Sequence, residues 1–194
     1  MRVFEVRCDI EHYQSFVSSD AKARGLEFNG SSKGCDWVVP KCEINDTRLK
    51  RGNFFSFVPG SGGIVMDETT FGTLADAEII GREWFPFQFQ GETLYLWNNI
   101  ECVNVLDSDR SRFREVPNGT SPLKVEEYAF HVSRMGPHFF KIPEEPLKHF
   151  AFSGWHDPLD ELKGIVEEHG FTGLIFKQIF WDGRPDPDVT LFDV

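Results

Sequence analysis

Apolar and polar residues alternate at several places in the chain, with the two-residue period of a half-buried β-strand. The segments with this period are residues 2–8, 84–90 and 127–132, and residues 36–40 and 138–142 are two further strand candidates that a proline ends. Pro86 lies inside the segment 84–90, where it cannot donate a ladder hydrogen bond, so we expect that strand at a sheet edge. The pattern therefore predicts a protein built mainly from strands.

Three other segments are apolar on both faces. Residues 93–106 carry the strongest strand signal, and their two largely apolar faces predict a central strand. Residues 64–66 predict a short strand, and residues 174–181 predict a buried one.

Two segments change to the helical period. Asp67 can cap a helix that continues to about residue 79. The clearer helix covers residues 158–169, with Asp157 as its N-cap and a proline at the first helical position. Gly170 suits the left-handed position after that helix.

Composition and element order together favour the α+β class. The chain has 20 Phe, and aromatic residues make up 14% of it, which favours strands over a helix bundle. We expect a largely antiparallel, aromatic-rich sheet with two main helices, and residues 63–89 and 149–181 suggest two similar strand–helix–strand units. Residues 1–56 are interpreted as an irregular, β-rich segment packed on the same domain, residues 57–181 as the α+β domain, and residues 182–194 as a C-terminal tail.

The charge balance excludes some partners. The chain holds 31 acids and 20 bases, a net charge of −11, which disfavours non-specific binding to nucleic acid or an anionic membrane. No long apolar run follows the N-terminus, so we expect a cytoplasmic protein with free thiols. The acidity suits a basic protein partner, or it serves solubility alone.

The motifs of common enzymes and metal sites do not occur in the sequence. There is no zinc-ligand spacing, no phosphate-binding glycine loop and no nucleophile elbow, so we expect neither metal nor cofactor. Asp107 and Arg110 follow the predicted central strand, where they could brace a loop or bind a ligand.

An ordered set of segments lies between about residues 57 and 180. The segments are residues 63–68, 85–87, 94–98, 104–107, 110–113, 139–143 and 170–176. In their order and spacing they resemble the bacterial polymorphic-toxin immunity proteins of immunity protein family eleven, formerly a domain of unknown function.

This resemblance implies an α+β binding protein, not an enzyme, which neutralises a cognate toxin in the producing cell by forming a complex. The family offers no catalytic residues to carry over. Five residues of its motif are expected to be structural: Asp107, Arg110, Ser111, Gly170 and Gly173.

If the toxin is basic, acidic side chains would form the contact surface. The candidates are Glu126, Glu127, Glu144, Glu145, Asp160, Glu161, Glu167 and Glu168.

Two hypotheses from other classes stay open. One is a small hydrolase or toxin-modifying enzyme with a site near Asp107, Arg110 and His131. The other is a small-ligand or sugar-binding module that uses exposed Trp and Phe side chains.

Overall fold

The computed structural model describes most of the chain. The described residues are 1–18, 20, 23, 26–58, 60–77, 83–114, 124–136, 139–154 and 157–183. His138 and residues 184–194, most of the predicted tail, lie outside them. No helix within this part of the chain is long and apolar enough to cross a membrane.

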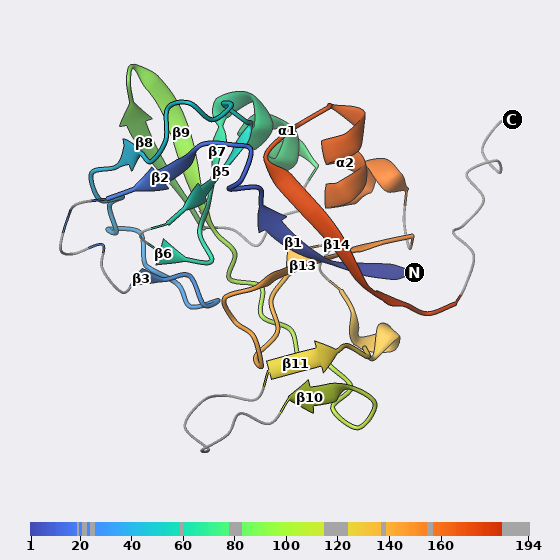
Figure 1. The fold of residues 1–194 in the computed structure, drawn as a ribbon. Coiled ribbons are helices and arrows are strands. Elements are labelled where there is room, and N and C mark those ends of the chain that lie inside the picture. Colours follow the sequence, from blue (N-terminus) through green and yellow to red (C-terminus); the bar gives the residue numbers. More distant parts are fainter. Residues whose placement is uncertain are drawn as a thin grey trace, which may run out of the picture.

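Two sheets form the body of the molecule (Figure 1). The four-stranded sheet has the order β12 (Phe139–Phe140), β13 (His149–Ser153), β1 (Arg2–Cys8) and β14 (Leu174–Trp181). The six-stranded sheet has the order β4 (Glu43–Ile44), β2 (Ser15–Val17), β5 (Phe54–Phe57), β7 (Ile64–Asp67), β9 (Glu92–Asn98) and β8 (Glu83–Phe89).

Two smaller pairs accompany these sheets. They are β10 (Arg112–Arg114) with β11 (Lys124–Glu127), and β3 (Leu26–Glu27) with β6 (Gly60–Ser61). Only the pairs β2–β5 and β3–β6 are parallel among the described ladders. The prediction of an α+β fold with largely antiparallel, aromatic-rich sheets is confirmed.

Each sheet contains one strand–helix–strand unit of the same topology. Helix α1 (Glu68–Asp76) connects β7 to β8, and both strands pair antiparallel with β9 between them. Helix α2 (Leu162–Glu168) connects β13 to β14, and both pair antiparallel with β1 between them. The similarity that the sequence suggested is therefore one of topology: each helix crosses over one antiparallel strand.

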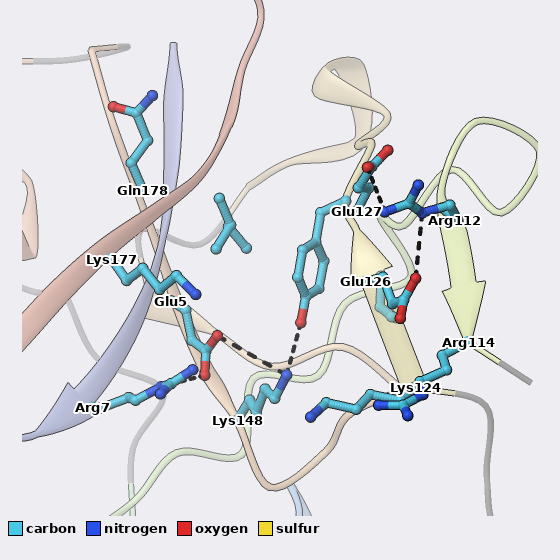
Figure 2. Close-up of a pocket in the computed structure, with 13 residues that line it drawn as sticks. Glu5, Arg7, Arg112, Arg114, Lys124, Glu126, Glu127, Lys148, Lys177 and Gln178 are labelled. Atoms are coloured by element: carbon cyan, nitrogen blue, oxygen red, sulfur yellow. Dashed lines mark hydrogen bonds and ion pairs between the residues drawn. The ribbon is translucent and has the colours of Figure 1, made fainter. Parts of the chain in front are cut away.

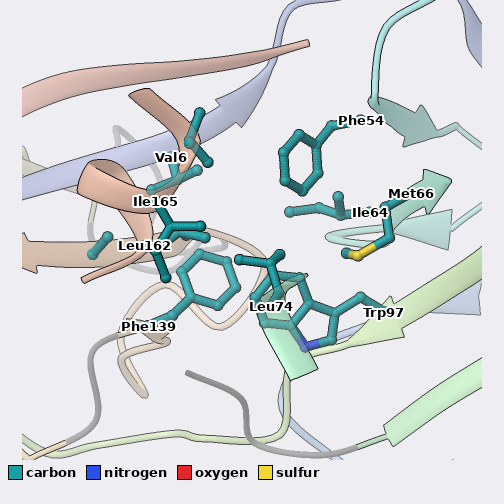
Figure 3. Packing of buried hydrophobic residues seen from close by; sticks show 11 residues of the cluster. Val6, Phe54, Ile64, Met66, Leu74, Trp97, Phe139, Leu162 and Ile165 are labelled. Carbon is teal, nitrogen blue, oxygen red and sulfur yellow. The ribbon is translucent and has the colours of Figure 1, made fainter. Parts of the chain in front are cut away.

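The two sheets and both helices share one apolar cluster, which Figure 3 shows from close by. Leu74 of α1 and Leu162, Ile165 and Val166 of α2 are buried in it. Trp97 of the six-stranded sheet lies 4.3 Å, between ring centroids, from Phe139 of the four-stranded sheet. This cluster joins the two halves of the chain.

The outer face of each sheet is also apolar and covered. Behind the four-stranded sheet, Phe150 and Phe152 pack with residues of the segment 103–135. Behind the six-stranded sheet, Phe55 and Phe57 pack with Phe16 and Phe28 from the first third of the chain. The phenylalanine excess is therefore core: Trp181 is the only aromatic among the exposed large hydrophobic side chains of the described residues.

Several predicted elements are confirmed in place. The strand over 2–8 is β1, and the proline-bearing strand β8 lies at an edge of its sheet. Asp67 caps α1 by accepting the N–H of Thr70 at 2.8 Å. Gly170 has φ +64°, and the N–H of Phe171 donates to the carbonyl of Val166, as a Schellman motif requires.

Other boundaries were wrong. Strand β9 ends at Asn98, because Asn98 and Asn99 are buried and their side chains bond to Glu83, Ser31 and Glu101 instead of continuing a ladder. The predicted strand 127–132 lies earlier, at β11, and residues 132–134 form a 3₁₀ turn (Val132–Arg134). Residues 36–40 form no strand, and β12 is only two residues long.

The second helix is interrupted and its following strand is not buried. Asp157 caps a 3₁₀ turn (Pro158–Asp160), and Glu161 is extended at φ −113°, so α2 begins only at Leu162. A Cβ on Gly164 would lie 1.8 Å from the Pro158 carbonyl oxygen. Helix α2 therefore packs closely against the 3₁₀ turn at Gly164, where only a glycine fits. Strand β14 is the edge of its sheet, and half of its residues are exposed.

A second joint between the sheets is made by backbone contacts. The carbonyl of Thr172, after α2, accepts the N–H groups of Asn53 and Phe54 at 3.0 and 2.9 Å. The Asn53 side chain accepts the N–H of Thr172 and donates to Asp67, the cap of α1. Gly173 has φ +102°, and a Cβ there would lie 2.2 Å from the carbonyl oxygen of Phe54.

Gly173→Ala tests this joint. We expect it to lower the free energy of unfolding by more than about 2 kcal/mol, because it adds a steric clash to a left-handed backbone. Gly170→Ala is the matched control, since its φ is also positive but its Cβ would meet nothing within 4 Å, so it should cost about 1 kcal/mol. Urea unfolding measures both, and equal losses would contradict the close approach.

Candidate functional site: a cationic cleft

A cleft of about 640 Å³ lies between the β10–β11 hairpin and the four-stranded sheet (Figure 2). Six cationic side chains line it: Arg7, Arg112, Arg114, Lys124, Lys148 and Lys177. Three acids line it as well: Glu5, Glu126 and Glu127. A protein of net charge −11 thus has a cleft with a cationic majority.

The floor of the cleft contains a buried carboxylate. Glu5 is 4% exposed, and Arg7 donates to it at 2.6 Å. Burial alone would raise the pKa of Glu5, but the Arg7 hydrogen bond and the nearby charges of Lys148 and Lys177 bring its pKa below the ordinary value. Glu5 is therefore ionised and neutralises part of the cationic floor.

Lys148 connects this floor to a second buried pair. Its Nζ lies 4.0 Å from Glu5, 2.8 Å from Glu145 and 2.8 Å from the Tyr128 hydroxyl. The Tyr128 hydroxyl also donates to Glu145. Burial and the Glu145 carboxylate raise the pKa of Tyr128, so the phenol stays protonated as a donor. These contacts fix Lys148 in place.

The hairpin wall carries two cations of a different kind. Arg112 is neutralised, since it lies 3.4 Å from Glu126 and 2.7 Å from Glu127. Arg114 and Lys124 lie directly opposite each other in the β10–β11 ladder, and neither has an ion pair with a described residue. Like charges at directly opposed strand positions destabilise the pair. The cleft thus concentrates positive charge at a cost in stability.

The eight acids predicted as a contact surface do not form one face. Glu126 and Glu127 lie in the cleft, and β11 is at the bottom of Figure 1 whereas α2 is at the top. Glu161 is 1% exposed and accepts the N–H of Gly154, so it is withdrawn from any surface.

The other five predicted acids also differ in exposure and pairing. Glu145 is 9% exposed and paired with Lys148, and Glu144 is half-buried. Glu167 is paired with Lys163. Asp160 and Glu168 are exposed at the α2 end of the molecule.

The alternative site near Asp107 is a loop brace. Asp107 accepts the N–H of Arg110 at 3.2 Å, and its carboxylate lies 3.9 Å from the Arg110 guanidinium and 3.7 Å from His131. The Ser111 hydroxyl donates to the Ala129 carbonyl and accepts the Ala129 N–H. The three residues of the enzyme hypothesis do come together, but their contacts hold the loop after residue 106 against the segment 129–131.

One buried lysine was not predicted from the sequence. Lys141 is fully buried, its Nζ has no hydrogen-bond partner among the described residues, and burial lowers its pKa to about 7. Burial and the charge of Lys141 hold the pKa of His149 well below its ordinary value. The Nε2 of His149 lies 2.8 Å from the Gly62 carbonyl. Lys141 follows the short strand β12, and nothing in the local pattern marks it as inward.

The cleft was missed as well. Its cations come from β1, β10, β11, β14 and the loop before β13, so no single stretch of sequence shows them together. Only residues 110–114, which have an arginine at every second position, gave a local signal.

No family model matches the chain, and no curated protein matches it. The similarity to toxin immunity proteins stays a prediction. No group of three or more His, Cys, Asp or Glu side chains that could hold a metal ion is found in the described part of the chain.

Arg114→Glu tests the like-charge pair. Facing Lys124, a glutamate turns repulsion into attraction, so the free energy of unfolding should rise by about 0.2–1 kcal/mol. Arg112→Glu is the matched control on the same strand, and it should destabilise because it places an acid beside Glu126 and Glu127. A loss of stability in Arg114→Glu, measured by urea unfolding at low salt, would contradict this geometry.

Lys141→Met tests the buried ammonium. Between pH 7 and 10.5 the unfolded chain keeps this proton and the folded chain has lost it, so stability rises with pH. From pH 7 to 8.5 the unmodified protein should gain about 1–2 kcal/mol more than Lys141→Met. Lys50→Met, at an exposed lysine, should leave the pH profile unchanged, whereas parallel profiles for all three proteins would refute the assignment.

Proposed function

We propose that this chain is an immunity-type binding protein that neutralises a cognate bacterial toxin in the cytoplasm of the producing cell by forming a protein–protein complex. The cationic cleft is its contact site, and it takes an acidic segment of the toxin. The observation that carries this proposal is the Arg114–Lys124 pair at the cleft wall, where like charges face each other and neither has an ion pair with a described residue.

The like-charge pair supports a ligand because it opposes folding in the free protein. A partner carboxylate placed between Arg114 and Lys124 would attract both cations and offset their mutual repulsion. This stabilisation would exist only in the complex. The floor contributes Lys148, which its ion pair with Glu145 and its Tyr128 contact hold in one position. A preorganised cation loses less entropy on binding.

The surrounding charge selects the kind of anion. Outside the cleft the chain is strongly acidic, so an extended polyanion such as nucleic acid would be repelled along most of its length. A short acidic segment presented by a folded partner meets only the cleft. The charge distribution therefore favours a protein ligand. The expected partner is a toxin with an acidic segment, not the basic toxin that the net charge alone had suggested.

The alternatives receive less support. A basic toxin would need the predicted acidic surface, yet Glu161 is buried and Glu126, Glu127, Glu145 and Glu167 already have partners. An enzyme would need Asp107, Arg110 and His131 free to act, whereas their contacts brace a loop.

Co-expression tests the proposal. The proposal requires a toxin encoded beside this chain, and the toxic domain of that protein should arrest growth when expressed alone and be tolerated when this chain is co-expressed. Arg114→Glu combined with Lys124→Glu should abolish protection and weaken the purified complex by at least about a hundredfold, because two attractive contacts become repulsive.

Lys41→Glu combined with Lys50→Glu is the matched control. It changes the net charge by the same amount at two exposed lysines that do not line the cleft, and it should keep protection. Toxicity that persists beside the unmodified chain would refute the immunity function. Protection by both double variants alike would place the contact site elsewhere.

A further inference from the structure

The edges of the two main sheets are protected to different degrees. An exposed edge strand offers unpaired N–H and C=O groups to another chain, and proteins protect such edges with prolines, charges or very short strands. Edge strands β4 and β12 have two residues each, and edge strand β8 contains Pro86. Three of the four edges therefore follow the usual rules.

Strand β14 is the least protected of the four edges, because Lys177 and a register shift at Ile179 are its only protective features among the described residues. It has eight residues without proline or glycine, in a sequence rich in β-branched and aromatic residues. It pairs with β1 on one side, and no described strand pairs with its other side. Ile175 is 45% and Trp181 55% exposed, and Lys177 is the only charge on the strand.

The two faces of β14 differ in chemistry. Lys177 lies opposite Glu5 in the ladder, and both line the cationic cleft. Phe176 lies opposite Val6, and both belong to the apolar cluster between the sheets, beside α2. Along residues 174–178, before the register of the ladder shifts at Ile179, a strand added to this edge would thus have alternate side chains over the cleft and over the apolar cluster.

We infer that β14 is a docking edge at which an extended segment of the partner adds as a fifth strand, with acidic and apolar side chains in alternation. The acidic side chains lie over the cleft and the apolar ones beside Phe176. This inference rests on the proposed function, since it names how the same partner is held. Backbone hydrogen bonds supply affinity in this mode, and the alternate side chains supply specificity.

Charge complementarity favours this occupant over a second copy of the chain. Two β14 edges paired with each other would bring Lys177 and the cleft of one copy against those of the other. An acidic segment instead places opposite charges on the same face.

Three fluorescent eight-residue peptides test the inference by anisotropy against the full chain at low salt. The parent alternates glutamate and valine; one derivative is N-methylated at every valine and the other at every glutamate. In an added strand the N–H groups of one set face β14 and those of the other face solvent. We expect the parent to bind, one derivative to lose at least about tenfold in affinity, and the other to bind nearly as the parent does.

The outcomes separate the two proposals. Equal binding of all three peptides would overturn strand addition and leave the cleft as a simple acidic-segment site. Absence of parent binding, or a lysine–valine peptide that binds as well as the parent, would also overturn it. A concentration-dependent dimer lost in Ile175→Lys, without peptide binding, would assign the edge to a second copy. The expected methylation pattern without protection in the co-expression experiment would keep the docking edge and refute the immunity function.

Discussion

The need to cover four apolar sheet faces governs this structure. Each main sheet has apolar side chains on both sides, and removing such surface from water is the dominant favourable term in folding. The inner faces cover each other through the cluster around Trp97 and Phe139, with α1 and α2 completing it. The outer faces need separate covers, which the first third of the chain and residues 103–135 supply.

The cleft is a consequence of the second cover. The segment that protects the outer face of the four-stranded sheet contributes Val125 and Phe130 to the apolar cluster, and the same segment carries the β10–β11 hairpin. The residues of this segment that face β1 and β14 are mostly charged or polar, as are the residues of β1 and β14 opposite them. The two surfaces therefore do not pack together, and a cleft remains between them. The remaining space collects Arg114, Lys124 and Lys177 beside the edge of β14, so packing and candidate function come from the same element.

Local patterns predicted what depends on local chemistry. The caps at Asp67 and Gly170, the edge position of the strand with Pro86 and the α+β class all follow from residues that are close in sequence. Predictions failed where long-range contacts decide. Strand β14 looks buried because it is apolar, yet it lies at an edge, and Asn98 ends β9 through Glu83 and Ser31, which are distant in sequence. The cleft needs five separate elements, so no periodicity could show it.

The central claim is that the cleft and the β14 edge together form the contact site for an acidic partner. Hydrogen–deuterium exchange of the complex with the cognate toxin domain tests this claim most directly. We expect slowed exchange in β10, β11 and β14, with little change in α2. Slowed exchange confined to α2 and the acids around Asp160 and Glu168, with unchanged exchange in the β10–β11 hairpin and β14, would contradict this claim.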